Sequence, residues 1–330
     1  YFIFGVDDKA IRAARQAIAK SGDTAWMGYW AGGLASWRSR QYEIAGAFFR
    51  MLVELENAPD VLRAGAAFWA HRALMRDGEP QKAMAYLDVA SYYPANFYGV
   101  VALQASGQIQ KMDFIQPEVS ENFLTWLIAQ AGGRRAMGLL QVGNWTEAAR
   151  ELRYLYADMP ETFSPDLIGF AARFNMPGLA FRLADIYRQD TGIEYNAALY
   201  PILDTDINFS VDAALIWSII RKESGFYPLA RSRAKAAGLM QLMPATAAFI
   251  ARDRKFRSSK RHLLHDPDVN LSLGQDYIAH LLDEPHIRGD LVRLLAAYNG
   301  GPGNLKKWLR STNHQDDPLL LIESIPARET

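Results

Sequence analysis

The sequence predicts an all-α protein that begins with a long series of stacked helices. Between residues 9 and 189, Ala, Leu and aromatic residues recur at spacings of three and four, which is the period of an amphipathic helix. Gly and Pro mark the joints between these segments, and no convincing strand pair or Asn-Gly hairpin occurs there. The expected helices cover residues 10–19, 25–38, 43–56, 59–76, 81–91, 97–106 and 121–131.

Several of these helices combine small residues with aromatic ones, as at 45–49 and 64–69. Small residues let neighbouring helices approach closely and aromatic side chains fill the space between pairs, which favours an irregular α-solenoid, or superhelix. A strict repeat period is lacking, so a compact helical domain is the alternative. The segment 143–149 is typical of a turn into a helical hairpin, with Asn144 or Thr146 as its cap.

The composition is that of an ordinary globular protein of 330 residues, enough for two or three domains. Lys plus Arg and Asp plus Glu balance at 36 each, which gives no reason to expect nucleic-acid binding. The absence of Cys excludes disulfides and Cys-ligated zinc. No apolar run approaches the roughly 18 residues of a membrane span. The chain starts at Tyr1 without a signal peptide, so we expect that a leader was removed or that the sequence was trimmed.

The character of the chain changes near residue 195. Pro201 and the polar stretch 204–206 predict a loop, and residues 211–222 predict a buried helix before a segment rich in motifs. We therefore expect a helical superhelix, a helical linker domain and a C-terminal domain, at residues 1–133, 134–194 and 195–330.

Glu223 ends the expected buried helix, just before Gly225 and Pro228 interrupt it. A carboxyl group held there between apolar packing and a turn would have a raised pKa, because burial disfavours its charged form. A general acid needs that property to be protonated near neutral pH. On its own, however, an acidic residue at a helix end is more often a solvated surface group.

Four sequence blocks follow one another in the C-terminal domain. They are ESGFYP at 223–228, GLMQLMP at 238–244, LHDP at 264–267 with Asn270, Gly274 and Tyr277, and AAYNGGPG at 296–303 with Trp308. Each block is a weak signal, but in this order they resemble the catalytic domain of the soluble lytic transglycosylase family. The tail is similar to that of the large family members that carry an N-terminal superhelix: it reads ESIP at 323–326 with Glu329 and Thr330.

The resemblance implies a goose-type lysozyme-like helical fold for residues 195–330. It also implies a lyase that cleaves the MurNAc-GlcNAc β-1,4 bond of peptidoglycan (murein) without water and leaves 1,6-anhydro-MurNAc ends. Three positions depart from the family pattern: Lys235 stands where Gly is often found, His265 where an apolar or aromatic residue is common, and Gly300 where Ala is common. None of them removes a catalytic group. Large members continue past the final Glu-Thr, so we expect a closing helix beyond Thr330.

The resemblance implies a single catalytic carboxyl, Glu223, whereas ordinary glycosidases use two. One suffices because the substrate supplies the other groups. The 2-acetamido group of N-acetylmuramic acid can stabilise the developing positive charge, and its C6 hydroxyl can then attack the anomeric carbon while Glu223 accepts the proton. Internal groups reach effective molarities of about 10⁵–10⁸ M, against roughly 55 M for bulk water, so cyclisation can win where water is excluded.

The resemblance also implies a set of substrate-binding residues. They are Ser224, Met240, Gln241, Tyr277, Tyr298, Asn299 and Glu323. Gln241 and Asn299 carry amides suited to hydrogen bonds with the acetamido group and sugar hydroxyls, or alternatively to holding loops. Tyr298 is expected to orient Glu223 or the acetamido group, although a bare Tyr in a helix is more often a core residue.

The remaining members of the set have plain structural alternatives. Ser224 is suited either to donating to substrate or to capping its turn. Met240 also suits the core or the floor of a cleft, and Glu323 is expected at the cleft rim. The stretch 252–261 holds six basic residues, which suits either a rim that attracts anionic muropeptides or a solvated loop. No histidine pattern indicates a metal, and neither a metal nor a cofactor is expected.

The expected partners are peptidoglycan glycan strands and muropeptides, together with cell-wall synthesis proteins, and the expected location is the periplasm. No nucleic acid and no transmembrane segment are expected. Two alternatives stay open. A muramidase that hydrolyses with water would leave a reducing end in place of an anhydro end. A non-enzymatic cell-wall scaffold would carry a degenerate domain, against which the intact Glu223, Gln241, Tyr298 and Asn299 argue.

Overall fold

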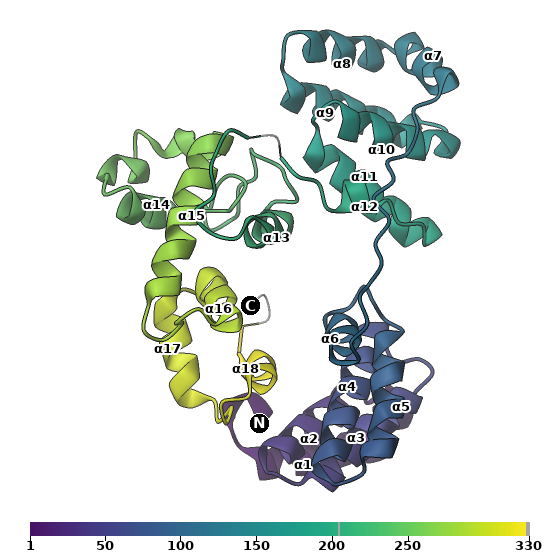
Figure 1. Ribbon diagram of the computed structural model, residues 1–330, viewed down its shortest axis with the longest axis vertical. Helices are drawn as coiled ribbons and strands as arrows, with labels where there is room; N and C mark the ends of the chain where they lie inside the picture. Colours follow the sequence, from purple (N-terminus) through teal and green to yellow (C-terminus); the bar gives the residue numbers. More distant parts are fainter. Residues whose placement is uncertain (204, 328–330) are drawn as a thin grey trace. The chain divides into compact units, whose positions relative to one another are not determined.

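The computed structural model describes residues 1–203 and 205–327. Its regular structure is helical, which confirms the expected all-α class (Figure 1). The β pairing found in these ranges consists of two isolated antiparallel bridges, Arg231 with Ala237 and Ala237 with Leu242. The chain packs as two compact units, one made of residues 1–111 with the described part of 284–330, the other of residues 112–283.

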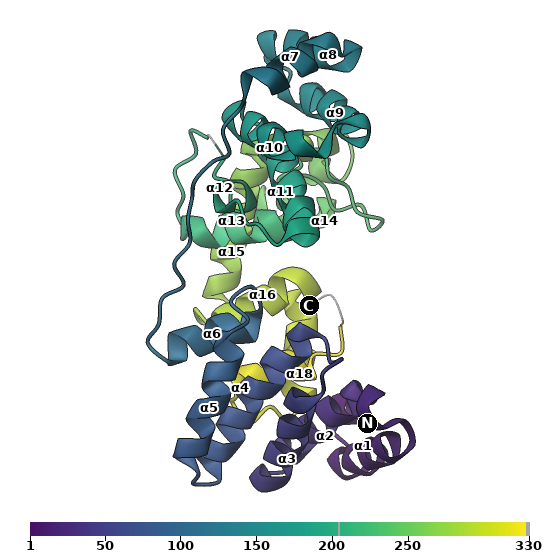
Figure 2. The same cartoon turned by 90° about the vertical axis from the view of Figure 1, so that its right-hand side faces the viewer.

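The first unit contains the predicted helical array. Its N-terminal elements are η1 (Phe2–Phe4), α1 (Asp7–Ser21), η2 (Gly22–Thr24), α2 (Trp26–Arg38), α3 (Tyr42–Glu54), α4 (Asp60–Arg76), α5 (Pro80–Ser91) and α6 (Phe97–Ala105). Each helix from α1 to α6 packs on the next along the chain, as expected of stacked helical pairs, and Figure 2 shows α3, α4 and α5 side by side. The C-terminal elements of this unit are α16 (Leu291–Gly300), α17 (Pro302–Ser311) and α18 (Pro318–Ser324).

Small residues let the helices of this array approach closely, as the sequence predicted. A Cβ on Gly33 would lie 2.5 Å from the ring of Phe49, and a Cβ on Gly65 would lie 2.8 Å from that of Trp30. The rings of Phe49 and Trp69 are fully buried and stack with their centroids 5.9 Å apart. Aromatic side chains therefore fill the space that the glycines leave between helices.

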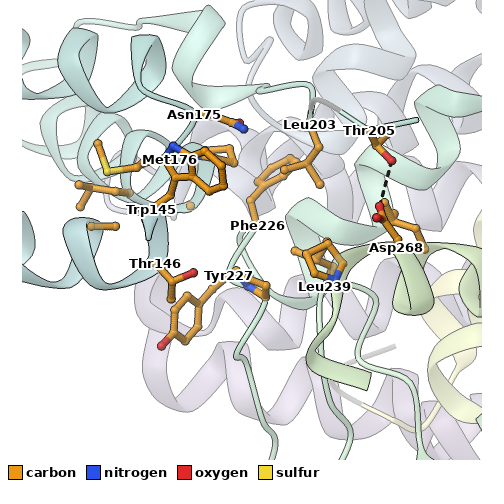
Figure 3. Close-up of a pocket in the computed structure, with 17 residues that line it drawn as sticks. Trp145, Thr146, Asn175, Met176, Leu203, Thr205, Phe226, Tyr227, Leu239 and Asp268 are labelled. Atoms are coloured by element: carbon orange, nitrogen blue, oxygen red, sulfur yellow. Dashed lines mark hydrogen bonds between the residues drawn. The ribbon is translucent and has the colours of Figure 1, made fainter. Parts of the chain in front are cut away.

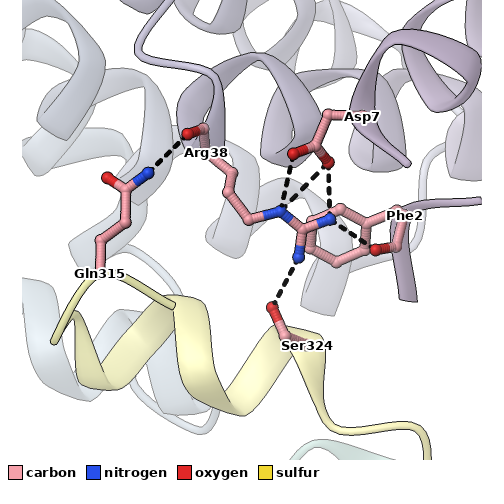
Figure 4. Close-up of polar contacts among 5 residues, drawn as sticks. All are labelled: Phe2, Asp7, Arg38, Gln315 and Ser324. Atoms are coloured by element: carbon pink, nitrogen blue, oxygen red, sulfur yellow. Dashed lines mark hydrogen bonds and ion pairs between the residues drawn. The ribbon is translucent and has the colours of Figure 1, made fainter. Parts of the chain in front are cut away.

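A buried arginine ties the C-terminal segment to this array (Figure 4). Arg38 is only 2% exposed, and its guanidinium contacts the carboxylate of Asp7 at 2.6 Å and donates to the hydroxyl of Ser324 at 3.3 Å. Its backbone oxygen accepts a hydrogen bond from Gln315 at 2.7 Å. A buried charge is tolerated when it is paired and fully hydrogen-bonded. Arg38 thereby holds both α1 and α18.

The second unit begins with helical pairs and continues into the segment that carries the first three sequence blocks. Its elements are α7 (Glu121–Ala129), α8 (Ala131–Gln141), α9 (Trp145–Leu155), η3 (Tyr156–Asp158), η4 (Glu161–Phe163), α10 (Ser164–Arg173), α11 (Pro177–Thr191), α12 (Asn196–Leu199), α13 (Ala213–Glu223), α14 (Pro244–Ile250), η5 (Arg254–Arg257), η6 (Arg261–His265) and α15 (Pro267–Asp283). Asn144 is the cap of α9, since its side chain accepts from the backbone nitrogen of Glu147.

Helix α11 packs directly against α13 and the turn that follows it. The Arg221 guanidinium donates to the carbonyl of Leu199 at 2.9 Å and lies 5.0 Å from the ring centroid of Phe181. At the start of α11, a Cβ on Gly178 would lie 2.8 Å from the carbonyl oxygen of Phe226. Residues 177–199 therefore support α13 and the turn after it within this unit.

The domain boundaries expected after residues 133 and 194 stay a prediction. The two compact units are defined by which residues pack together, and the first of them joins the two ends of the chain. The expectations that concern residue 204, Glu329 and Thr330 lie outside the described residues. Among the helices that the structure describes, none has both the length and the apolar character needed to cross a membrane.

Candidate active site

Glu223 is the last residue of α13 and emerges at the edge of a packed core. The helix buries Ile216, Ile219 and Ile220 just before it. Burial raises the pKa of Glu223, and the positive charge of Lys222 lowers it to a smaller extent. Within the described residues, no hydrogen bond or ion pair to the Glu223 carboxylate compensates the burial. This carboxyl group therefore keeps its proton to a higher pH than an ordinary Glu.

The turn after α13 adopts a backbone conformation that L-residues rarely take. Gly225 has φ +55° and Phe226 has φ +63°. Ser224 stabilises the helix end by donating from its backbone nitrogen at 3.0 Å and its hydroxyl at 3.1 Å to the carbonyl of Ile220. Phe226 is buried and meets Phe181 of α11 edge to face at 5.9 Å. Packing of the Phe226 ring thus offsets the cost of its left-handed backbone.

The second sequence block forms a tight loop around the isolated bridges. Gly238 has φ +81°, and a Cβ there would lie 2.0 Å from the carbonyl oxygen of Leu264, so glycine alone fits. Gln241 donates from Nε2 to the carbonyl oxygens of Ala230 at 3.1 Å and Gly238 at 2.8 Å. Both hydrogens of the side-chain amide thus form hydrogen bonds within the loop, whereas no described residue donates a hydrogen bond to the amide oxygen. Gln241 can therefore offer a ligand an acceptor.

The side chain of Asn270 in α15 holds this loop in place through hydrogen bonds. It is 1% exposed and makes three hydrogen bonds. Its Oδ1 accepts from the backbone nitrogen of Met240 at 2.7 Å, and its Nδ2 donates to the carbonyls of Ala237 at 3.0 Å and Leu264 at 2.8 Å. A buried side-chain amide satisfied in this way specifies one loop conformation.

Two other expected substrate-binding residues lie in the same unit as Glu223. Met240 has no exposed surface, and a Cβ on Gly274 of α15 would lie 2.0 Å from its sulfur. The Met240 side chain therefore packs inside the loop, and its expected contact with substrate stays a prediction. Tyr277 of α15 is half-buried, and burial raises its pKa.

Tyr298 and Asn299 belong to the first unit, where they lie near the end of α16. Tyr298 is half-buried and Asn299 is exposed. The next residue, Gly300, faces the ring of Trp308, which a Cβ there would approach to 2.3 Å. The departure from the family pattern at Gly300 thus goes with close packing of α16 on α17.

Glu323, which was expected at a cleft rim, faces the helical array of the first unit. The hydroxyl of Tyr98 donates to its Oε1 at 2.6 Å, and Trp69 donates from Nε1 to that hydroxyl at 2.8 Å. Burial raises the pKa of Glu323, while hydrogen bonds from Tyr98 and Trp30 act against this. These contacts attach α18 to the array, and the expected place of Glu323 at a cleft rim stays a prediction.

The basic stretch 252–261 forms a short exposed segment around η5 with its own ion pair. Lys260 lies 2.8 Å from the carboxylate of Asp253, and hydrogen bonds from Lys260 and from the backbone of Lys255 lower the pKa of Asp253. The ring of Phe256 anchors the segment in the core. Its exposure and its internal ion pair favour the interpretation of residues 252–261 as a solvated loop over that of a rim that attracts anionic muropeptides. In the part of the chain that the structure describes, no group of three His, Cys, Asp or Glu side chains could hold a metal ion.

Sequence reasoning missed the supporting residues of the site. Asn270 was recognised only as part of a block, and Gly178 was not singled out. The only local signal for Gly178 is a glycine directly after Pro177, inside the first turn of a helix, where it weakens the helix without an evident reason. Close approach of another backbone supplies that reason here.

Comparison with known proteins supports the family that the motifs suggested. Residues 202–320 match the Transglycosylase SLT domain. The soluble lytic murein transglycosylase of Escherichia coli K12 is 35% identical over 115 residues, which cover 34% of this chain and 17% of the relative. A putative soluble lytic murein transglycosylase of Haemophilus influenzae is 31% identical over 153 residues, covering 46% of this chain and 23% of the relative. The matched part thus spans less than a quarter of these curated relatives.

The fold is also shared with solved structures. The lytic transglycosylase Slt of Pseudomonas aeruginosa, solved as an inactive mutant, is 25% identical with a TM-score of 0.75, covering 96% of this chain and 51% of that one. The 70 kDa soluble lytic transglycosylase of Escherichia coli is 21% identical with a TM-score of 0.72, covering 90% and 47%. The present chain spans about half the length of both. Its residues 202–320 match the transglycosylase SLT domain, and the chain is similar to soluble lytic transglycosylases, as its motifs predicted.

Proposed function

We propose that this chain is a lytic transglycosylase that cleaves the β-1,4 bond between N-acetylmuramic acid and N-acetylglucosamine in peptidoglycan. The observation that carries the proposal is the state of Glu223. It lies at the end of a buried helix in an SLT domain, with a raised pKa and no compensating partner among the described residues. That is the state a general acid requires.

In the proposed reaction, Glu223 first donates its proton to the glycosidic oxygen as the bond from that oxygen to the anomeric carbon breaks. The acetamido carbonyl of the substrate stabilises the positive charge that develops on the sugar. The C6 hydroxyl oxygen of the same sugar then bonds to the anomeric carbon, and its proton passes to the Glu223 carboxylate. The enzyme returns to its starting state, no water is consumed, and a 1,6-anhydro end results.

The other site residues are given proposed roles from the hydrogen bonds that they form or leave open. Gln241 is proposed to accept a hydrogen bond from the acetamido N–H or a sugar hydroxyl, because its own N–H groups are used by the loop. Tyr277, Tyr298 and Asn299 are proposed to contact the sugar, and Ser224 to keep the turn in place. The relatives are named for action on murein, so we also propose a periplasmic location, with peptidoglycan strands and muropeptides as the ligands.

Digestion of purified sacculi, followed by mass spectrometry of the soluble products, tests the proposal. We expect anhydro ends, each lighter by one water molecule than the reducing end that a hydrolytic muramidase would leave. Glu223→Gln should abolish release, whereas Glu118→Gln, which removes an exposed carboxylate from the same unit, should not. Reducing ends would identify a hydrolytic muramidase. No release by the wild type would favour a non-enzymatic cell-wall scaffold.

A further inference from the structure

A strongly basic surface segment of the second unit follows directly on α14. Residues 249–262 contain six Lys and Arg side chains and a single acidic one, Asp253, in a chain whose net charge is zero. Four of these cations are exposed, and so is the aromatic ring just before them. We call the exposed members of this segment the basic patch: Phe249, Arg252, Arg254, Lys255 and Arg257.

The cations of the basic patch have no counter-charge within the protein. One carboxylate oxygen of Asp253 lies 2.8 Å from the ammonium of Lys260, and the other accepts from the backbone nitrogen of Lys255 at 2.9 Å. The side chains of the basic patch form no ion pair with any residue that the structure describes. The patch therefore keeps a positive field that an anionic surface can neutralise.

The backbone beneath the basic patch is held in one conformation. Arg252 has φ +51°, and its backbone nitrogen donates to the carbonyl of Phe249 at 3.2 Å. The backbone nitrogen of Asp253 donates to the carbonyl of Ala248 at 3.1 Å, and the ring of Phe256 is buried beneath the segment. Cations that project from an ordered turn lose less backbone freedom on binding than those of a flexible tail.

Phe249 adds an apolar side chain to this charged surface. It is 60% exposed, although Phe is among the residue types that are most often buried. The ring of His280 in α15 meets it edge to face with the centroids 5.1 Å apart, which keeps the Phe249 ring in place at the surface. An exposed aromatic ring beside unpaired cations suits the interface of an anionic lipid bilayer. There the ring enters the boundary between headgroups and acyl chains, and the cations contact the lipid phosphates.

The composition of the basic patch favours a lipid surface over a protein partner. The centre of a protein interface is largely apolar and depleted of charged residues, whereas the basic patch combines one aromatic ring with four cations. The patch is also separate from the catalytic turn. None of its residues lines the pocket of about 300 Å³ beside Phe226 and Tyr227 (Figure 3). A ligand in that pocket therefore does not occupy the patch.

We propose that the basic patch binds the surface of a membrane that contains anionic phospholipids, with Phe249 inserted at the headgroup boundary. The attachment is peripheral and reversible, because four cations and one ring bind at the surface and do not span it. The patch lies within residues 202–320, so its binding holds the SLT domain next to the membrane. The proposal rests on the charge and exposure of the patch and not on the reaction of the chain. Glu223→Gln should therefore bind membranes as the wild type does.

Binding is measured by sedimentation of the full chain with phosphatidylcholine vesicles, prepared with or without phosphatidylglycerol. We expect binding only to the vesicles that contain phosphatidylglycerol, and added salt should weaken it by screening the attraction. The triple variant Arg254→Gln/Lys255→Gln/Arg257→Gln should lower the partition coefficient about a hundredfold, because each basic residue near an anionic surface contributes about fivefold. Phe249→Ala should lower it about tenfold, because the ring is no longer buried in the membrane.

A matched control removes the same charge from the other unit. Arg12→Gln/Arg15→Gln/Lys20→Gln neutralises three exposed cations of α1 and should leave vesicle binding unchanged, while both triple variants keep the Tm of the wild type. Equal binding to phosphatidylcholine alone, an equal loss in the α1 variant, or no loss in Phe249→Ala would overturn the proposal. Binding to sacculi that requires the patch, without binding to vesicles, would assign the surface to peptidoglycan and overturn it as well. Vesicle binding by a chain that cleaves no sacculi would refute the proposed function and leave this inference standing.

Discussion

Replacing Asn270 by Ala removes the side chain that fastens the loop carrying Gln241. Three hydrogen bonds are lost, at 2.7, 2.8 and 3.0 Å, all in a residue that is 1% exposed. Each such bond contributes about 1 kcal/mol net, and buried groups left unpaired cost about 1–3 kcal/mol each unless water enters the vacated space. We expect a loss of about 3 kcal/mol in the free energy of unfolding. For a unit of this size, that lowers Tm by roughly 6–12 °C.

Thermal and urea unfolding measure the stability loss, and turnover of a soluble glycan per folded molecule measures the effect on the site. Gln275→Ala is the matched control, because Gln275 is a buried amide on the same helix whose Oε1 accepts from the backbone nitrogen of Ser210 at 2.9 Å, away from the Gln241 loop. Both variants should lose stability, and only Asn270→Ala should raise KM. A stability loss below about 1 kcal/mol, or equal kinetic effects of both variants, would refute the reasoning.

Three further predictions follow from the same region. Gly178→Ala should lower kcat with little loss of secondary structure, because its Cβ would lie 2.8 Å from the carbonyl oxygen of Phe226 and must displace the catalytic turn; unchanged kcat with a folded protein would contradict this. Lys235→Gly should raise the unfolding free energy by about 0.5–1 kcal/mol, measured by urea unfolding, because Lys235 has φ +75° and glycine adopts that conformation freely. The acid form of Glu223 is lost as pH rises through its raised pKa, so activity should fall along an alkaline limb that lies above the ordinary Glu value of 4.5. Lys222→Gln, which removes the positive charge that lowers this pKa, should move the limb to higher pH, and a shift to lower pH would contradict the assignment.

Local periodicity was enough to predict the helices from α1 to α6 and the buried helix α13. The expected segment 59–76 became α4 at Asp60–Arg76, and 97–106 became α6 at Phe97–Ala105, because each amphipathic stripe is set by residues three and four positions apart. Glu223 was likewise placed at a helix end by the apolar run before it and the Gly and Pro after it.

Contacts between distant positions could not be predicted in this way. Asn270 reaches partners up to 33 positions away, and Glu323 bonds with Tyr98, which lies 225 positions earlier. A charged residue such as Arg38 is expected at the surface by residue type, yet its pairing with Asp7 and Ser324 keeps it buried. Whether a polar side chain is buried and hydrogen-bonded to a distant segment depends on which segments pack together. A local sequence pattern does not contain that information.

The central claim is that Glu223 is the single catalytic acid and base, and that the C6 hydroxyl of the substrate, not water, attacks the anomeric carbon. Digestion of sacculi in water labelled with heavy oxygen, followed by mass spectrometry of the new chain ends, tests it most directly. The account predicts anhydro ends that carry no label, and their complete absence in the folded Glu223→Gln variant. Labelled reducing ends as the main product, or unchanged release of anhydro ends by Glu223→Gln, would contradict it.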